Sequence, residues 1–299
     1  MSNVAQAVAI SNASAGEPFW SKLANWRTAV LLVLVSWLYA PILGHLVIQW
    51  WRDPNFSHGF FVPLFSAFIV WQDRGRLAAI PKAPSAWGIP VIVLALLTLI
   101  LGVFGAELFL SRASIILLIA GLVLFFAGRE VLIAVLFPVL LLILMIPIPA
   151  IVFSQVTFPL QILASKLAAW SLPIFGVPVL REGNVINLPA MPLEVAEACS
   201  GIRSLLSLTT LAIMYGYLME KNVAIRFALA LASIPVAVAA NGLRIVGTGL
   251  LVQYWDPDKA EGFFHAFSGW LIFVVSLLML FVLHQLLILA LARRREASA

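Results

Sequence analysis

The apolar stretch 227–250 reads FALALASIPVAVAANGLRIVGTGL, and it indicates both the kind of fold and where chemistry could occur. A helix crosses a bilayer with roughly 20 predominantly apolar residues, so this stretch predicts a membrane span. Asn241 and Arg244 are three residues apart and therefore lie on one face of that helix, close to its C-terminal end. A charge inside a spanning helix costs at least about 2.5–3.5 kcal/mol and usually faces a functional cavity. Snorkelling of Arg244 to the interface is the alternative interpretation.

The whole chain shares this apolar character. Hydrophobic residues make up 63% of it and charged residues 10%, whereas soluble domains have about 45–50% and about 25%. The net charge of +5 is spread between the apolar runs, as expected for orientation signals and not for a nucleic-acid site. The composition predicts an all-α, polytopic membrane helix bundle of about eight transmembrane helices.

The eight predicted spans lie at about 28–49, 59–72, 87–105, 109–127, 131–153, 200–219, 227–250 and 265–291. The run 59–72 is short, which fits either a tilted span or a re-entrant segment. Residues 154–198, between spans five and six, are broken up by prolines such as Pro159. There Gln161–Leu167 indicates an interfacial amphipathic helix, and Val179–Val195 alternates like β-structure. We expect these residues to form an external interfacial segment.

Positive charge orients this topology. With both termini cytoplasmic, 11 of the 18 basic residues fall on the cytoplasmic side: Lys22, Arg27, Arg74, Arg76, Lys82, Arg129, Lys221, Arg226, Arg293, Arg294 and Arg295. This bias follows the positive-inside rule. The expected organisation is a loose cytoplasmic tail over 1–26, a transmembrane domain over 27–292 and a basic cytoplasmic tail over 293–299.

Three polar blocks then fall on the outer side of the membrane. The first holds Cys199, the only cysteine, within Glu197-Ala198-Cys199-Ser200-Gly201-Ile202-Arg203. The second holds Asn241 and Arg244, and the third is Phe264-His265-Ala266-Phe267-Ser268-Gly269-Trp270. If Cys199 begins a helix, the backbone N–H groups favour its thiolate, and Arg203 lies on the same face one turn on.

Each of these residues also has a structural interpretation. A lone membrane cysteine is usually a small buried hydrophobe, and His265 could serve only as an interfacial anchor. His58 lies in the polar turn Asp53–Gly59, which could form part of a pocket rim. His284 and His45 sit within apolar runs and are interpreted as structural. Since close-spaced Cys/His pairs and Gly-rich phosphate loops are absent from the sequence, we expect no metal, cofactor or nucleic-acid partner.

The combined motifs resemble the exosortase/archaeosortase family of multi-pass membrane cysteine enzymes. The resemblance is carried by Ala198–Ile202, by Asn241-Gly242-Leu243-Arg244-Ile245 and by His265 with Ser268-Gly269. Further similar segments are Asp53-Pro54-Asn55, Ser57-His58-Gly59 and Pro147-Ile148-Pro149. Together they span roughly residues 30–290.

This resemblance implies a cysteine protease or transpeptidase of the bacterial cytoplasmic (inner) membrane, with its active site facing the periplasm. Its partners would be exported proteins that end in a Pro-Glu-Pro-type motif, a transmembrane helix and basic residues, with a link to exopolysaccharide and surface display. Cys199 would form a thioester and pass the acyl group to water or another acceptor. His265 would be the general acid/base, and Arg244 would stabilise the oxyanion. Glu197 would orient Arg203 or His265, and Asn241 and His58 are supporting candidates.

Two other classes of protein remain as alternatives. A multi-pass transporter would use Arg203, Arg244 and Asn241 to line an anion path, although no internal repeat is evident. A non-catalytic scaffold for polysaccharide export would tolerate loss of Cys199. The sequence does not determine the oligomeric state.

Overall fold

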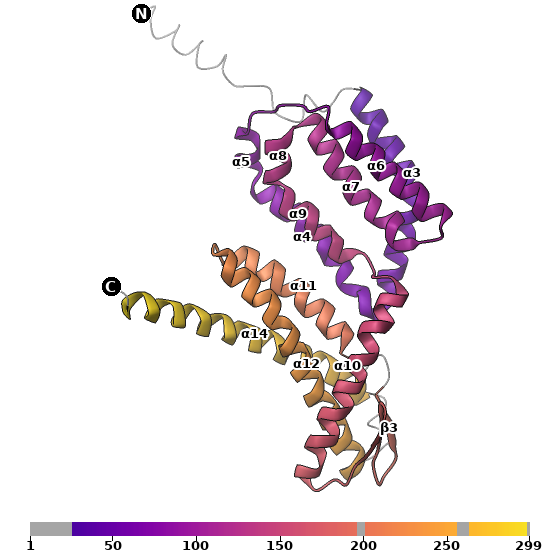
Figure 1. The fold of residues 1–299 in the computed structure, drawn as a ribbon, viewed down its shortest axis with the longest axis vertical. Coiled ribbons are helices and arrows are strands. Elements are labelled where there is room, and N and C mark those ends of the chain that lie inside the picture. The colour runs from indigo at the N-terminus through magenta and orange to yellow at the C-terminus, as the bar shows by residue number, and fades with distance from the viewer. Residues whose placement is uncertain (1–25, 196–200, 256–262, 298–299) are drawn as a thin grey trace, which may run out of the picture. The chain divides into compact units, whose positions relative to one another are not determined.

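The computed structural model describes residues 26–195, 201–255 and 263–297, and Figure 1 traces the course of the chain. The chain divides into two compact units. The first contains residues 1–48 and 68–140, and the second contains residues 49–67 and 141–299. The second unit therefore combines a short N-terminal segment with the whole C-terminal half.

An antiparallel helix pair forms the centre of the first unit. The pair consists of α6 (Gly88–Phe104) and α7 (Leu108–Phe126), and α3 (Trp26–Arg52) contributes to the same core. Gly102 lets the two helices approach closely, because a Cβ there would meet the backbone of Ser111. The Tyr39 hydroxyl lies 2.9 Å from Ser114 Oγ, so this buried polar pair is satisfied within an apolar core. Three shorter helices lie wholly or almost wholly in this unit, α5 (Arg74–Ala79), α8 (Arg129–Ala134) and α9 (Leu136–Leu141), whereas α4 (Phe61–Gln72) begins in the second unit and ends in the first.

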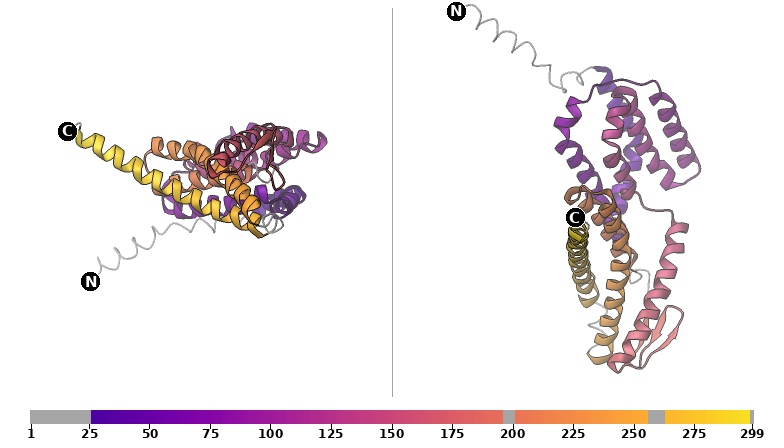
Figure 2. Two further views of the ribbon diagram at one scale, coloured as in Figure 1. Left: turned by 90° about the horizontal axis from the view of Figure 1, so that it is seen from below. Right: turned by 60° about the vertical axis from the view of Figure 1, so that its left-hand side comes forward.

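Three long helices dominate the second unit. Helix α11 (Ile202–Met219) turns back into α12 (Val223–Tyr254), and α14 (Phe263–Ala297) packs against both. Figure 2 shows α14 as one long helix that crosses α12. The shared core of the three helices is built from Leu208, Ala212, Ile225, Leu229, Ala237 and Leu280.

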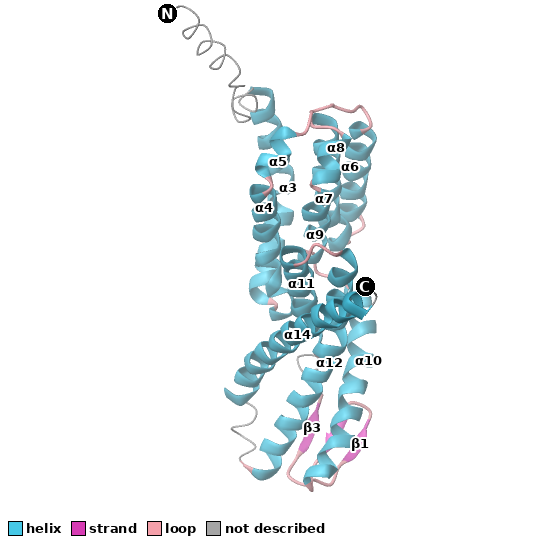
Figure 3. Cartoon of the chain, turned by 90° about the vertical axis from the view of Figure 1, so that its left-hand side faces the viewer, coloured by secondary structure: helices cyan, strands magenta, loops and turns pink. Residues whose placement is uncertain are grey.

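A second core in this unit joins α12 to a helix and a small sheet. Helix α10 (Ala150–Ser171) continues into the 3₁₀ segment η3 (Leu172–Phe175) and packs on α12, where Gly242 faces Leu167. The sheet has the order β1 (Leu180–Glu182), β2 (Val185–Asn187), β3 (Pro192–Glu194), and all its pairs are antiparallel. Figure 3 shows it beside α10, and Ser165 Oγ ties the two together by donating to the Gly183 carbonyl at 3.0 Å. The prediction of β-structure over Val179–Val195 is thus confirmed.

Two predictions around the prolines were wrong. The expected span 131–153 is not one helix: α8, α9 and the 3₁₀ segment η2 (Leu142–Met145) follow one another, and the chain is non-helical from Ile146 to Pro149. Pro147 and Pro149 lack an N–H and disfavour helix in the residues before them. Conversely, Pro159 does not break the chain, because α10 passes through it as one helix that includes Gln161–Leu167. Prolines inside apolar helices are tolerated where neighbouring groups re-satisfy the backbone.

Five described helices are long and apolar enough to cross a membrane: Ala29–Arg52, Leu108–Phe126, Ala150–Phe175, Ile202–Met219 and Val223–Tyr254. Three shorter apolar helices accompany them, Gly88–Phe104, Leu136–Met145 and Phe273–Leu289. The all-α membrane helix fold is therefore confirmed. The number of eight crossings and the external segment between spans five and six stay predictions.

Thiol labelling tests this topology. In a Cys199→Ala background we expect a single cysteine at Glu182, in the sheet, to react with a membrane-impermeant maleimide in intact cells. A cysteine at Lys221, between α11 and α12, should react only after permeabilisation, because one crossing separates the two positions. Both side chains are exposed, so burial does not limit labelling. Labelling of both from the same side would contradict the orientation.

Candidate active site

The structure describes the predicted site residues unequally. Cys199 and Glu197 lie outside the described residues. His265 is the third residue of α14, and only its backbone is described. The positions of Arg203, Arg244, Asn241 and His58 are described in full, so the candidate site is built from these and from the residues that flank 196–200.

The residues before this segment are fixed by the sheet. Val195 directly follows β3, and its N–H donates to the Asn184 carbonyl at 2.9 Å. Asn184 Nδ2 donates back to the Val195 carbonyl at 3.3 Å. The Val195 side chain is buried in the core shared by α10, the sheet and α12. The chain therefore leaves the sheet from a well-anchored position beside α12.

The residues after this segment are held by a close contact with the same helix. Gly201 adopts φ +82°, in the left-handed region, and caps the N-terminus of α11. A Cβ at this position would lie 2.8 Å from Asn241 Cγ. Only glycine combines this backbone conformation with so close an approach. Asn241 itself is buried, and Arg244 follows one turn later.

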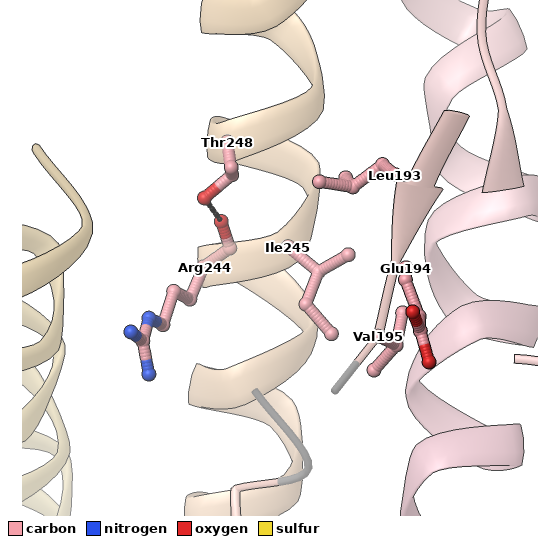
Figure 4. A pocket seen from close by; sticks show the side chains of 6 residues that line it. All are labelled: Leu193, Glu194, Val195, Arg244, Ile245 and Thr248. Atoms are coloured by element: carbon pink, nitrogen blue, oxygen red, sulfur yellow. Dashed lines mark hydrogen bonds between the residues drawn. The ribbon is translucent and has the colours of Figure 1, made fainter. Parts of the chain in front are cut away.

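Arg244 lies one turn after Asn241 on α12 and lines a pocket together with Val195. This small pocket is lined by Leu193, Glu194, Val195, Arg244, Ile245 and Thr248. In Figure 4 the Arg244 guanidinium points to the side of α12 opposite the sheet, away from the Glu194 carboxylate. Thr248 Oγ1 donates to the Arg244 carbonyl at 2.9 Å, which secures the backbone of this turn.

Arg203 does not have the relation to Cys199 that the sequence suggested. Helix α11 begins at Ile202, and its cap Gly201 is left-handed, so no continuous helix runs from residue 199 to residue 203. The expected i,i+4 alignment was therefore wrong. Arg203 lies in the first turn of α11 with an exposed side chain.

His58 belongs to a compact polar turn in the second unit, which also contains α11 and α12. The 3₁₀ segment η1 (Pro54–Phe60) is capped by Asp53, whose side chain accepts from the Asn55 N–H at 2.9 Å. His58 Nε2 lies 3.2 Å from the Leu144 carbonyl. Burial lowers the pKa of His58, and the Leu144 and Asn55 carbonyls oppose this by favouring the protonated ring.

A neighbouring tryptophan completes this arrangement. Trp50 Nε1 donates to the Met145 carbonyl at 2.9 Å, and Gly59 packs so closely on the Trp50 indole that a Cβ would clash with it. His58 and Trp50 thus engage two successive carbonyls at the end of η2, where Pro147 stops the helix. The sequence suggested the Asp53–Gly59 turn but gave no sign that it contacts η2, just before Pro147.

Sequence reasoning also missed two buried polar groups. His284 links Tyr215, whose hydroxyl lies 2.8 Å from Nδ1, to Glu220, whose Oε1 lies 2.8 Å from Nε2. Tyr215 and Glu220 lie toward the end of α11 that is remote from Gly201, so this cluster is separate from the candidate site. Arg112 of α7 is only 3% exposed. Neither group has a local motif, and the partners of His284 are at least 64 residues away in the sequence.

Comparison with known families decides the assignment. The model of the transmembrane exosortase family matches residues 50–282. The chain belongs to the transmembrane exosortase family. The match extends from Trp50 through the α14 segment and thus includes the Cys199, Arg244 and His265 blocks, as well as the Asp53–Gly59 turn. Among curated proteins and solved structures, nothing matches this exosortase significantly.

The Gly201 contact generates a prediction with an internal control. Replacing Gly201 by Ala imposes left-handed strain of about 1–2 kcal/mol and also pushes a methyl group into Asn241. Replacing Gly183 by Ala imposes similar strain at φ +64°, but nothing lies within 4 Å of that Cβ. We expect Gly201→Ala to lower the melting temperature of the detergent-purified protein clearly more than Gly183→Ala does. Equal shifts for the two variants would mean that the Asn241 contact contributes nothing.

Proposed function

We propose that this exosortase is a cysteine protease or transpeptidase that cleaves the C-terminal sorting tail of exported proteins. The observation that carries the proposal is the anchoring of residues 195 and 201 against the α12 turn that holds Asn241 and Arg244. Two peptide units join Cys199 to Gly201, so covalent geometry limits their Cα atoms to about 7 Å apart. Cys199 therefore lies within about two residues of the Gly201–Asn241 contact, and we pair it with Arg244, one turn further along α12.

In the proposed reaction Cys199 is the nucleophile. Its Sγ attacks the scissile carbonyl near a Pro-Glu-Pro-type motif, the C–N bond breaks, and the acyl group stays on sulfur as a thioester. A thiolate is the reactive form of cysteine, and a nearby cation lowers the pKa of a thiol. Arg244 supplies such a cation and cannot lose its own proton near neutral pH. Arg203 and Glu197 are assisting residues in this proposal.

Arg244 also has the chemistry needed to stabilise the transition state. As the carbonyl becomes tetrahedral, negative charge develops on its oxygen, and a donor already in place stabilises that charge strongly in a partly desolvated site. The planar guanidinium has five N–H donors in a fixed geometry. Asn241, buried against Gly201, acts as a positioning residue because it holds the start of α11 against α12.

His265 is the proposed general acid/base. It lies in the first turn of α14, and α14 packs against α12 and α11. In this role it takes the thiol proton and returns it to the departing amine, which balances the first half-reaction. The role requires that the imidazole come within hydrogen-bond reach of Cys199, directly or through one water, when substrate is bound.

The cellular setting follows from the same proposal. Substrates are exported proteins with a motif, a transmembrane helix and a basic end, so the scissile bond lies at the outer surface of the bacterial cytoplasmic membrane. The thioester is then resolved by water or by an acceptor that supports surface display or exopolysaccharide assembly. The enzyme needs no cofactor for these steps.

In-cell processing tests the proposal. We expect Cys199→Ala, as the sole copy, to leave a tagged Pro-Glu-Pro-tail precursor uncleaved at matched expression. Arg244→Lys keeps the charge but loses the planar donors, so processing should fall about 10²–10³-fold, the usual cost of one oxyanion donor. Leu243→Ala, at the exposed neighbouring position, should behave like the wild type. Unchanged cleavage in Cys199→Ala would contradict the proposal and favour a transporter or scaffold.

A further inference from the structure

The η1 turn contains two buried polar atoms that have no hydrogen-bond partner among the described residues. Asn55 is only 9% exposed, and its Oδ1 has no hydrogen-bond partner among the described residues. In the same described part of the chain, His58 Nδ1 is also buried and lacks a hydrogen-bond partner. Buried polar groups are nearly always hydrogen-bonded, so a pair of unused atoms in one turn needs an explanation.

Both atoms are acceptors. A carbonyl oxygen can only accept, so the contact of His58 Nε2 with the Leu144 carbonyl assigns the ring proton to Nε2. Burial lowers the pKa of His58 and so favours the neutral ring, although the Leu144 and Asn55 carbonyls act in the opposite direction. In the neutral ring with its proton on Nε2, Nδ1 carries a lone pair. Asn55 Oδ1 is a carbonyl oxygen and accepts as well.

The geometry of the turn brings the two acceptors to one side. Residues three apart in a 3₁₀ helix are eclipsed, so the side chains of Asn55 and His58 share a face of η1. A ligand that satisfies both must offer at least two N–H or O–H groups and must be small, since both atoms are covered. Water and a primary amine meet these requirements, and both are nucleophiles.

The turn belongs to the unit that holds the candidate site. Segment η1 packs against α11, the helix whose cap follows Cys199 by two residues, and lies with it in the second compact unit. Phe56 packs against Phe153 of α10, with ring centroids 5.7 Å apart. The Asp53 cap and the contact of Gly59 with Trp50 hold the turn rigidly. A preorganised pair of acceptors next to α11 is suited to orienting a reactant.

We propose that Asn55 and His58 bind the nucleophile that releases the acyl group from Cys199, either a primary amine or water. This inference rests on the proposed thioester mechanism. The lone pair of the nucleophile forms the new bond to the acyl carbon, and the C–S bond breaks with its electrons kept by Cys199 Sγ as a thiolate. The proton that the nucleophile loses passes to His58 Nδ1, while Asn55 Oδ1 accepts a second N–H or O–H and fixes its orientation.

Two variants separate this role from a structural one. Asn55→Leu keeps the approximate shape and removes an unpartnered buried acceptor, so it should leave the melting temperature unchanged or raise it. His58→Gln keeps an N–H that can reach the Leu144 carbonyl but has no equivalent of Nδ1. Ser57→Ala, on an exposed side chain of the same turn, is the matched control.

The test uses the full-length enzyme in detergent with a purified Pro-Glu-Pro-tail protein, in water alone and with added glycinamide. For both variants we expect the rate of the first turnover of precursor cleavage to stay within about twofold of the wild-type rate. Steady-state turnover should fall at least about tenfold, and the thioester on Cys199 should accumulate. If the rates of hydrolysis and of amide formation both fall, the subsite binds both water and the amine. A fall in one product alone assigns it to that nucleophile.

Three outcomes would overturn the inference. If the first turnover falls in parallel with steady-state turnover, the pair serves substrate binding or the fold. If Asn55→Leu and His58→Gln behave like Ser57→Ala in every step, the acceptors hold a structural water. If Cys199→Ala still cleaves the precursor, the thioester mechanism itself fails. This result is distinguishable from a failure of the subsite proposal, because the Cys199→Ala variant leaves Asn55 and His58 unchanged.

Discussion

The candidate site depends on a single steric constraint, the contact between Gly201 and Asn241. A left-handed backbone at residue 201 and a Cβ position only 2.8 Å from Asn241 Cγ leave room for glycine alone. This contact fixes the start of α11 against α12, one turn from Arg244. The sheet fixes the other end of the same short segment, at Val195, through paired hydrogen bonds with Asn184. The described residues on the two sides of segment 196–200 are thus both held beside α12.

Much of this arrangement could be predicted from the sequence, because its causes are local. Apolar runs of bilayer length can satisfy their backbone only as helices, and the alternation in Val179–Val195 became the three-stranded sheet. Asn241 and Arg244 share a helix face because of their spacing. The prolines were harder to interpret: Pro147 and Pro149 end a helix, whereas Pro159 lies inside α10. The difference depends on neighbouring groups and not on proline itself.

Long-range pairings could not be predicted from one sequence. The start of α11 depends on the backbone of Gly201, so the alignment expected between Cys199 and Arg203 failed. His284 seemed to lack polar partners, yet it links Tyr215 and Glu220. The engagement of the η2 carbonyls by His58 and Trp50 joins segments about 90 residues apart. Such contacts follow from tertiary packing, and local propensity carries no signal for them.

The polar groups of the second unit also differ in how well the protein satisfies them. The buried His284 has two partners, as a structural group does, whereas Asn55 Oδ1 and His58 Nδ1, like Thr157 Oγ1 of α10, have no hydrogen-bond partner among the described residues. Proteins depart from complete satisfaction of buried polar groups mainly at functional or strained sites. This contrast supports different roles for the two clusters, with the η1 turn next to α11 as the one that serves the reaction.

The thioester on Cys199 is the central claim, and mass spectrometry tests it most directly. Purified wild-type enzyme would be mixed with a Pro-Glu-Pro-tail protein, quenched with acid during turnover and mapped by peptide mass. The account predicts an adduct of the substrate fragment on the peptide that contains Cys199, and hydroxylamine should remove it. Product formation without any adduct on that peptide, or with an adduct on another residue, would contradict the account.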